Sequence, residues 1–140
     1  MKIGYDAKRL YKNFTGLGNY SRTLVGNLQL FYPENEYYLY TPDIRQNEVT
    51  DSFLNNAAFH TVMPRGKLKG WWRTSAIKKD LKKDRIDIFH GLSHEIPLRM
   101  QHTGIRSVVT IHDIIYRTFP DMYSLIDRKI YDFKFKYACR

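Results

Sequence analysis

Two apolar stretches, Ile86-Asp87-Ile88-Phe89-His90 and Ser107-Val108-Val109-Thr110-Ile111, decide the class of fold. Each is short and nearly continuous in its apolar residues, whereas a strand with one face in water alternates apolar and polar side chains. Strands of this kind are typical of a parallel sheet that helices cover on both faces. The two stretches therefore predict strands that are buried on both sides.

Further strand-like and helix-like segments alternate around these two stretches. We expect strands over residues 1–5, 36–41 and 59–63 and helices over 20–31, 71–85 and 123–139. The first helix has apolar residues at three- and four-residue spacing, an N-cap at Asn19 and a stop at Pro33. This alternation predicts an α/β fold, a Rossmann-like, doubly wound parallel sheet with helices on both faces. Ligands of such sheets bind beyond the carboxyl ends of the strands.

Composition narrows the class of protein further. The chain has 140 residues, which suits one domain, and carries 23 Lys and Arg against 14 Asp and Glu. The formal charge of +9 favours an anionic partner, but no helix-turn-helix, RNA-recognition or zinc-finger pattern accompanies it, so no nucleic acid is expected. The single cysteine, Cys139, excludes an internal disulfide framework. Without a signal peptide or a long apolar run, we expect a cytoplasmic protein, peripheral to the inner face of the membrane at most.

The first candidate site follows the first strand, where Thr15-Gly16-Leu17-Gly18-Asn19 leads into a helix. Glycines let the backbone approach a ligand closely, and a helix N-terminus attracts anions. Gly16, Gly18 and Asn19 are therefore candidate substrate-binding residues for a phosphate or a sugar hydroxyl. The alternative is a simple strand-to-helix turn that requires glycine. A dinucleotide-binding fingerprint is not complete, because its third glycine would fall at Ser21.

Polar residues follow the fourth and fifth strands as well. His90, Ser93 and His94 are candidate substrate-binding residues, with a metal site or a plain solvated loop as alternatives. Three histidines without a diagnostic spacing lead us to expect no metal. His112 and Asp113 are the candidate catalytic residues, since the carboxylate can orient the imidazole or raise its pKa. The alternatives are a structural histidine and an aspartate that caps the next turn.

A basic, tryptophan-containing segment lies between the third and fourth strands. Its candidate contacts with an anionic membrane surface are Lys67, Lys69, Trp71, Trp72 and Arg73. Paired tryptophans beside cations suit the headgroup level of a bilayer. The alternative is a crossover helix that packs its apolar residues on the sheet and turns its lysines to water.

Taken together, the chain resembles the N-terminal half of a family 4 glycosyltransferase, which has the GT-B fold. The resemblance runs through essentially the whole chain in order. It rests on Met1–Ala7, Gly16–Arg22, Asp87–Gly91, Pro97-Leu98, Val108–Asp113 and Phe119-Pro120. In this family a sugar is transferred, usually with retention, from a nucleotide-sugar donor to a glycan or lipid-linked acceptor.

The resemblance implies roles for the candidate residues. Gly16 and Gly18 would lie against the donor phosphates or the acceptor, and His112 would contact the transferred sugar with Asp113 as its neighbour. No cofactor other than the donor and no metal is implied. The family's C-terminal, nucleotide-binding domain is not within residues 1–140, so we expect an N-terminal, acceptor-side domain that is inactive alone.

Two other functions remain open at this point. One is a non-enzymatic basic α/β module that docks on an anionic membrane or nucleic acid through residues 65–85. The other is a dinucleotide-dependent enzyme. Two features disfavour it: Ser21 replaces the third glycine of the fingerprint, and Thr41 stands at the end of the second strand, where an acidic residue is expected.

Overall fold

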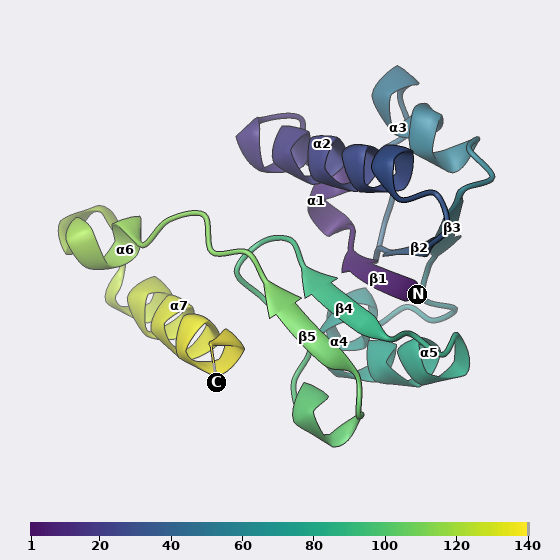
Figure 1. Ribbon diagram of the computed structural model, residues 1–140. Coiled ribbons are helices and arrows are strands. Elements are labelled where there is room, and N and C mark those ends of the chain that lie inside the picture. Colours follow the sequence, from purple (N-terminus) through teal and green to yellow (C-terminus); the bar gives the residue numbers. More distant parts are fainter. Residues whose placement is uncertain (140) are drawn as a thin grey trace.

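The computed structural model describes residues 1–139 and contains one five-stranded sheet in which all strands run parallel (Figure 1). The strands are β1 (Lys2–Asp6), β2 (Glu36–Tyr40), β3 (Phe59–Val62), β4 (Ile88–Gly91) and β5 (Arg106–Val109). Their order is β3-β2-β1-β4-β5, so the direction of winding reverses between β1 and β4. This confirms the predicted α/β class with a Rossmann-like sheet, and it places the crevice for ligands at the carboxyl ends of β1 and β4.

The helices lie on both faces of the sheet and beyond its carboxyl edge. They are α1 (Lys8–Lys12), α2 (Gly16–Phe31), α3 (Glu48–Leu54), α4 (Lys69–Trp71), α5 (Ile77–Lys83), α6 (Ile115–Thr118) and α7 (Leu125–Ala138). Figure 1 shows α1, α2 and α3 on one side of the sheet and α4 and α5 on the other. A π-helical turn over Trp72–Ala76 joins α4 to α5, and short 3-10 helices cover Met100–His102 and Pro120–Met122.

Each face of the sheet has its own apolar core. On the α1 and α2 side, Tyr5 stacks on Tyr37 with ring centroids 6.3 Å apart, and both tyrosines are fully buried. On the α5 side, Tyr40 and Phe89 pack with Trp72 and other apolar residues of the crossover. The large rings of β1, β2 and β4 therefore fill the space between sheet and helices, as double-sided burial requires.

The fifth strand departs from the prediction that it is buried on both faces. Most of Arg106–Val109 is exposed, and Val108 retains 48% of its accessible surface. The physical reason is its place at the edge of the sheet, where β4 is its only neighbouring strand among residues 1–139. An apolar run alone does not distinguish an edge strand from a central one.

The first predicted helix begins earlier than expected, and its predicted cap is wrong. α2 starts at Gly16, with Thr15 in the N-cap position, so Asn19 lies inside the helix. There the Asn19 side chain accepts a hydrogen bond from the Arg22 guanidinium at 2.7 Å. The predicted end at Pro33 agrees with the last helical residue, Phe31.

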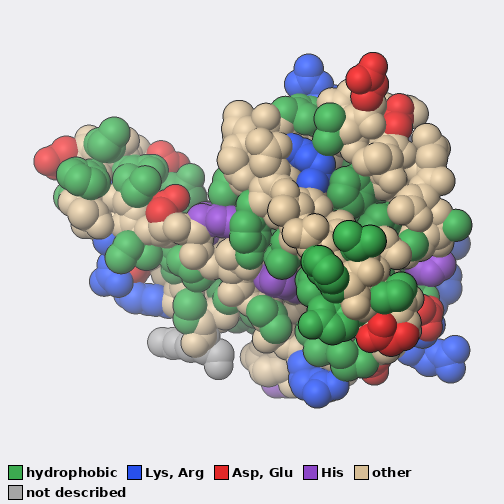
Figure 2. All heavy atoms as spheres, turned by 45° about the horizontal axis from the view of Figure 1, so that its top comes forward, with side chains coloured by type: hydrophobic (Ala, Val, Ile, Leu, Met, Phe, Trp, Pro, Cys, Tyr) green, Lys and Arg blue, Asp and Glu red, His purple; other side chains and the backbone are tan. Residues whose placement is uncertain are grey.

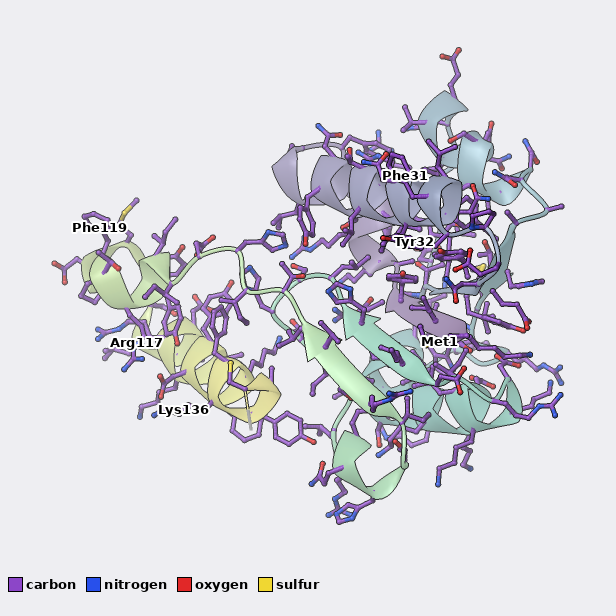
Figure 3. The ribbon with its side chains drawn as sticks, in the orientation of Figure 1. Met1, Phe31, Tyr32, Arg117, Phe119 and Lys136 are labelled. Carbon is purple, nitrogen blue, oxygen red and sulfur yellow. The ribbon has the colours of Figure 1, made fainter. Side chains whose placement is uncertain are left out.

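The last two helices form an arm that continues from β5. In Figure 1, α6 and α7 lie beyond the arrowheads of β4 and β5. Figure 3 shows Arg117, Phe119 and Lys136 on this arm, far from Met1, Phe31 and Tyr32 at the opposite side of the molecule. No helix within residues 1–139 is long and apolar enough to cross a membrane.

Candidate functional site

The loops after β4 and β5 are held together by Thr110, which follows the last residue of β5. The backbone N–H of Thr110 donates to the Gly91 carbonyl, and its own carbonyl accepts from the His94 N–H, both at 2.9 Å. The Thr110 hydroxyl lies 2.8 Å from Nε2 of His90 and 3.2 Å from the Tyr20 hydroxyl of α2. One side chain thus joins β4, β5 and α2 at the switch point of the sheet.

His112 lies against this group of loops with a defined ring orientation. Its Nε2 is 2.8 Å from the Leu92 carbonyl oxygen, which can only accept, so Nε2 carries the hydrogen. In the neutral ring, Nδ1 is then the acceptor. The ring meets Tyr20 edge-on at 4.8 Å between centroids and lies 5.2 Å from the ring of His94.

Asp113 does not act on the neighbouring imidazole through any described hydrogen bond. Its carboxylate accepts a hydrogen bond from the Ile115 N–H at 3.1 Å, at the start of α6. The alternative of a turn-capping aspartate therefore describes this residue, and the Leu92 carbonyl, which the sequence did not indicate, orients the histidine.

His94 is the most constrained residue of the group. Its φ of 58° lies in the left-handed region, which costs a residue with a Cβ about 1 kcal/mol. The ring stacks on Phe135 of α7 at 4.8 Å, and its Nδ1 is buried without a hydrogen-bond partner among the described residues. Burial and the nearby His112 lower the pKa of His94, and burial also lowers the pKa of His90. Both rings are therefore neutral at neutral pH.

The loop that carries these residues is tightly folded. A Cβ on Gly91 would lie 2.0 Å from the Glu95 carbonyl oxygen, so glycine is required there for the loop to fold back. Ser93 is buried in this loop, with 7% of its surface exposed. It is held in the site region but is not open to solvent as a sugar-binding hydroxyl would be.

The two glycines after β1 have different surroundings. A Cβ on Gly18 would lie 1.6 Å from the Asn13 carbonyl oxygen, whereas nothing lies within 4 Å of one on Gly16. The Asn13 side chain also accepts from the N–H groups of Thr15 and Gly18, both at 3.0 Å. The Gly18 N–H in the first turn of α2 is thus already bonded, and Gly18 serves close packing while Gly16 borders open space.

A larger cleft lies at the carboxyl ends of β1, β2 and β4, and none of the predicted substrate-binding residues lines it. It has a volume of about 600 Å³, and side chains of α7 form one wall. At its base, the Arg73 guanidinium binds Asp6 at 2.6 Å and Glu95 at 2.7 Å. Lys134 of α7 binds the other oxygen of Glu95 at 2.8 Å.

These ion pairs favour the charged forms of Glu95 and Arg73. Burial alone would raise the pKa of Glu95, but Arg73 and Lys134 more than offset it and hold this pKa below its usual value. Burial disfavours the charge of Arg73, yet Asp6 and Glu95 outweigh it and keep its pKa above the usual value. The pattern Asp6 … Arg73 … Glu95 spans too much sequence for any local motif to reveal it.

Part of the predicted membrane-contact segment is withdrawn from the surface. Trp72 is buried and its indole N–H donates to Asp80 at 2.6 Å, while Arg73 is held in the ion pairs described above. The π-helical turn rotates these two residues toward the sheet. Lys67, Lys69 and Trp71 remain exposed, so only these three of the five predicted residues can meet a membrane.

Within residues 1–139, no group of three or more histidine, cysteine, aspartate or glutamate side chains is arranged to hold a metal ion. No protein-family model, curated protein or solved structure matches the chain. What the observations define is an α/β protein with a Rossmann-like parallel sheet, in which three histidines gather at the carboxyl ends of β4 and β5.

Proposed function

We propose that this chain is the acceptor-side domain of a glycosyltransferase that moves a sugar from a nucleotide-sugar donor to a glycan or lipid-linked acceptor. The observation that carries the proposal is the convergence of Tyr20, His90, His94 and His112 on the loops that Thr110 joins. These side chains lie at the switch point, where ligands of open α/β sheets bind. A second, nucleotide-binding domain would supply the donor.

The chemistry asked of these residues is positioning rather than covalent attack. Nδ1 of His112 is the free acceptor of a ring fixed by the Leu92 carbonyl, so it can bind a sugar hydroxyl in one orientation. Tyr20 contacts that ring edge-on. The negative charge on the leaving diphosphate would need hydrogen-bond donors aimed at it, and the second domain would supply most of them.

Substitution of His112 tests the proposal. In the complete protein that carries this domain, His112→Ala should lower the rate of sugar transfer about a hundredfold, because an oriented contact to the reacting sugar is lost. The measurement is transfer of labelled sugar from nucleotide-sugar donors to acceptors extracted from membranes.

His102→Ala is the matched control, since His102 is exposed on the short helix Met100–His102, away from the site. It should retain the transfer rate of the unsubstituted protein. Equal rates for the two alanine variants would remove His112 from the mechanism, and absence of transfer from every nucleotide sugar would contradict the proposal itself.

A second, additional role is peripheral contact with an anionic membrane. The specific observation is that Leu68 and Trp71 are exposed side by side with Lys67 and Lys69 in the segment before α5. Trp71→Ser should reduce sedimentation with vesicles of phosphatidylglycerol and phosphatidylcholine by several-fold, because an interfacial ring is lost. Trp71→Phe should keep most of the binding, and equal sedimentation of the serine variant and the parent chain would exclude the contact.

A further inference from the structure

The cleft of about 600 Å³ beyond β1, β2 and β4 has an unbalanced set of charges. Its cationic lining residues are Lys8, Lys12, Lys69, Arg73, Lys129 and Lys134, whereas its acidic lining residues are only Asp43 and Glu95. Figure 2 shows Lys and Arg side chains gathered on one side of the arm that contains α7. A cleft with this excess of cations attracts anions.

The ion pairs inside the cleft leave two ammonium groups without a carboxylate. Asp43 is shared by Lys12 and Lys69, at 3.0 and 3.4 Å, and Glu95 is shared by Arg73 and Lys134. Among residues 1–139, neither Lys8 nor Lys129 forms an ion pair. They come from two different elements that line the cleft, since Lys8 begins α1 and Lys129 lies on α7.

Lys8 is also held in an environment that disfavours its own charge. It is half-buried, and burial together with the neighbouring Arg73 and Arg9 lowers its pKa. A bound anion would offset this repulsion and stabilise the charged ammonium group. The free protein therefore holds Lys8 in a position that an anionic ligand would stabilise.

Apolar side chains on α7 and on the loop after β4 also line the cleft. They are Ile96, Leu98, Ile130 and Phe133. Phe133 and Ile130 are largely exposed in the free chain, so covering them would remove apolar surface from water. The cleft thus combines cations with apolar side chains, and this combination fits a ligand with an anionic head and an apolar substituent.

We propose that this cleft binds a phosphorylated ligand with an apolar portion, its phosphate between Lys8 and Lys129 and its apolar part against Ile130 and Phe133. The identification of this ligand as the sugar acceptor rests on the proposed function. The binding of a phosphorylated, partly apolar ligand in the cleft is independent of that function. The site lies apart from the His112 group, because neither His112 nor Thr110 lines the cleft.

Calorimetric titration of the chain with three probes tests the proposal. Octyl phosphate, which has both parts, should bind about tenfold or more tightly than inorganic pyrophosphate or octyl glucoside, which have one part each. Lys8→Gln and Lys129→Gln should each weaken octyl phosphate binding about tenfold, with the loss diminishing as salt rises. Thermal unfolding of both variants checks that the fold is retained, and Lys129 is exposed enough for its replacement to leave the fold intact.

Lys83→Gln is the matched control, because Lys83 is an exposed lysine at the end of α5 that does not line the cleft. It should leave the affinity unchanged. Equal weakening by Lys83→Gln and Lys8→Gln would overturn the proposal in favour of general charge attraction. Equal affinity for octyl phosphate and pyrophosphate would overturn the apolar part of the site.

The source of the phosphate is resolved by a second arm. The chain is sedimented with vesicles of phosphatidylcholine and phosphatidic acid in equal amounts. Sedimentation of the parent chain that is lost in Lys129→Gln would assign the site to a lipid headgroup. Saturable octyl phosphate binding without sedimentation would assign it to a soluble phosphorylated molecule. Sedimentation without any octyl phosphate binding would overturn the cleft as the site. None of these results depends on sugar transfer, so failure of one proposal is distinguishable from failure of the other.

Discussion

At the scale of single residues, Arg73 organises the region that the sequence described least well. Its basic and aromatic neighbours in sequence predict a membrane contact. In the structure only 14% of its side chain is exposed, and it binds carboxylates that are 67 and 22 positions away. Local composition could not indicate this, since both partners are brought to Arg73 by the sheet. His90, His94 and His112, by contrast, lie near one another because they come from the carboxyl ends of the neighbouring strands β4 and β5.

The lowered pKa values of His90 and His94 predict a dependence of stability on pH. Both residues have a usual pKa of 6.5 in the unfolded chain and a lower one when folded, so the unfolded state binds more protons in this range. Their contribution to the free energy of unfolding is complete above pH 6.5 and is lost as the pH falls through the folded pKa values. Chemical unfolding monitored by tryptophan fluorescence between about pH 8 and about pH 5, a range that includes the usual pKa of histidine, measures this contribution.

The variant His90→Gln with His94→Asn removes both titrating rings, and asparagine tolerates the left-handed backbone of position 94. Its stability should change less over the same range than that of the parent chain. His102→Gln, which removes an exposed histidine, should leave the slope unaltered. A slope that persists in the double variant would assign the effect to other groups.

At the scale of elements, the start of α2 contains two glycines with different roles. Close packing requires a glycine at position 18 but not at position 16. Gly18 meets the Asn13 carbonyl, whereas Gly16 faces open space. Gly18→Ala should lower the free energy of unfolding by about 2–3 kcal/mol, because the backbone of α2 must move away from Asn13. Gly16→Ala should change it by less than about 0.5 kcal/mol, a value typical of surface positions. Urea denaturation of both variants measures the difference, and equal stabilities would refute the packing role of Gly18.

The same helix shows what element-level patterns could and could not predict. The apolar spacing in residues 20–31 correctly located its buried face, but the first turn, Gly16–Asn19, contains no apolar period and was assigned to a loop. The crossover was predicted as one helix over 71–85, whereas it consists of α4, a π-helical turn and α5 over 69–83. The short helices α1 and α3 were not predicted at all, because five to seven residues show too little periodicity.

At the scale of the whole molecule, alternation of strands and helices predicted a parallel sheet, and the structure confirms it. The positions of the strands were predicted to within two residues at either end. The alternation does not determine the order of the strands, because several orders satisfy the same pattern. The cleft beside α7 was missed for the same reason, since it is formed by residues that only the order β3-β2-β1-β4-β5 brings together.

The central position of β1 has a consequence for how the chain acquires its structure during synthesis. Of the five strands of the sheet, β1 leaves the ribosome before the others, and β2 follows soon enough to pair with one of its edges. Its other edge must wait for β4, and the Lys2 N–H waits for the carboxylate of Asp87, 85 positions later. During translation the nascent half-sheet therefore exposes an unpaired inner edge, which makes this interval the stage at which chaperones have most to protect.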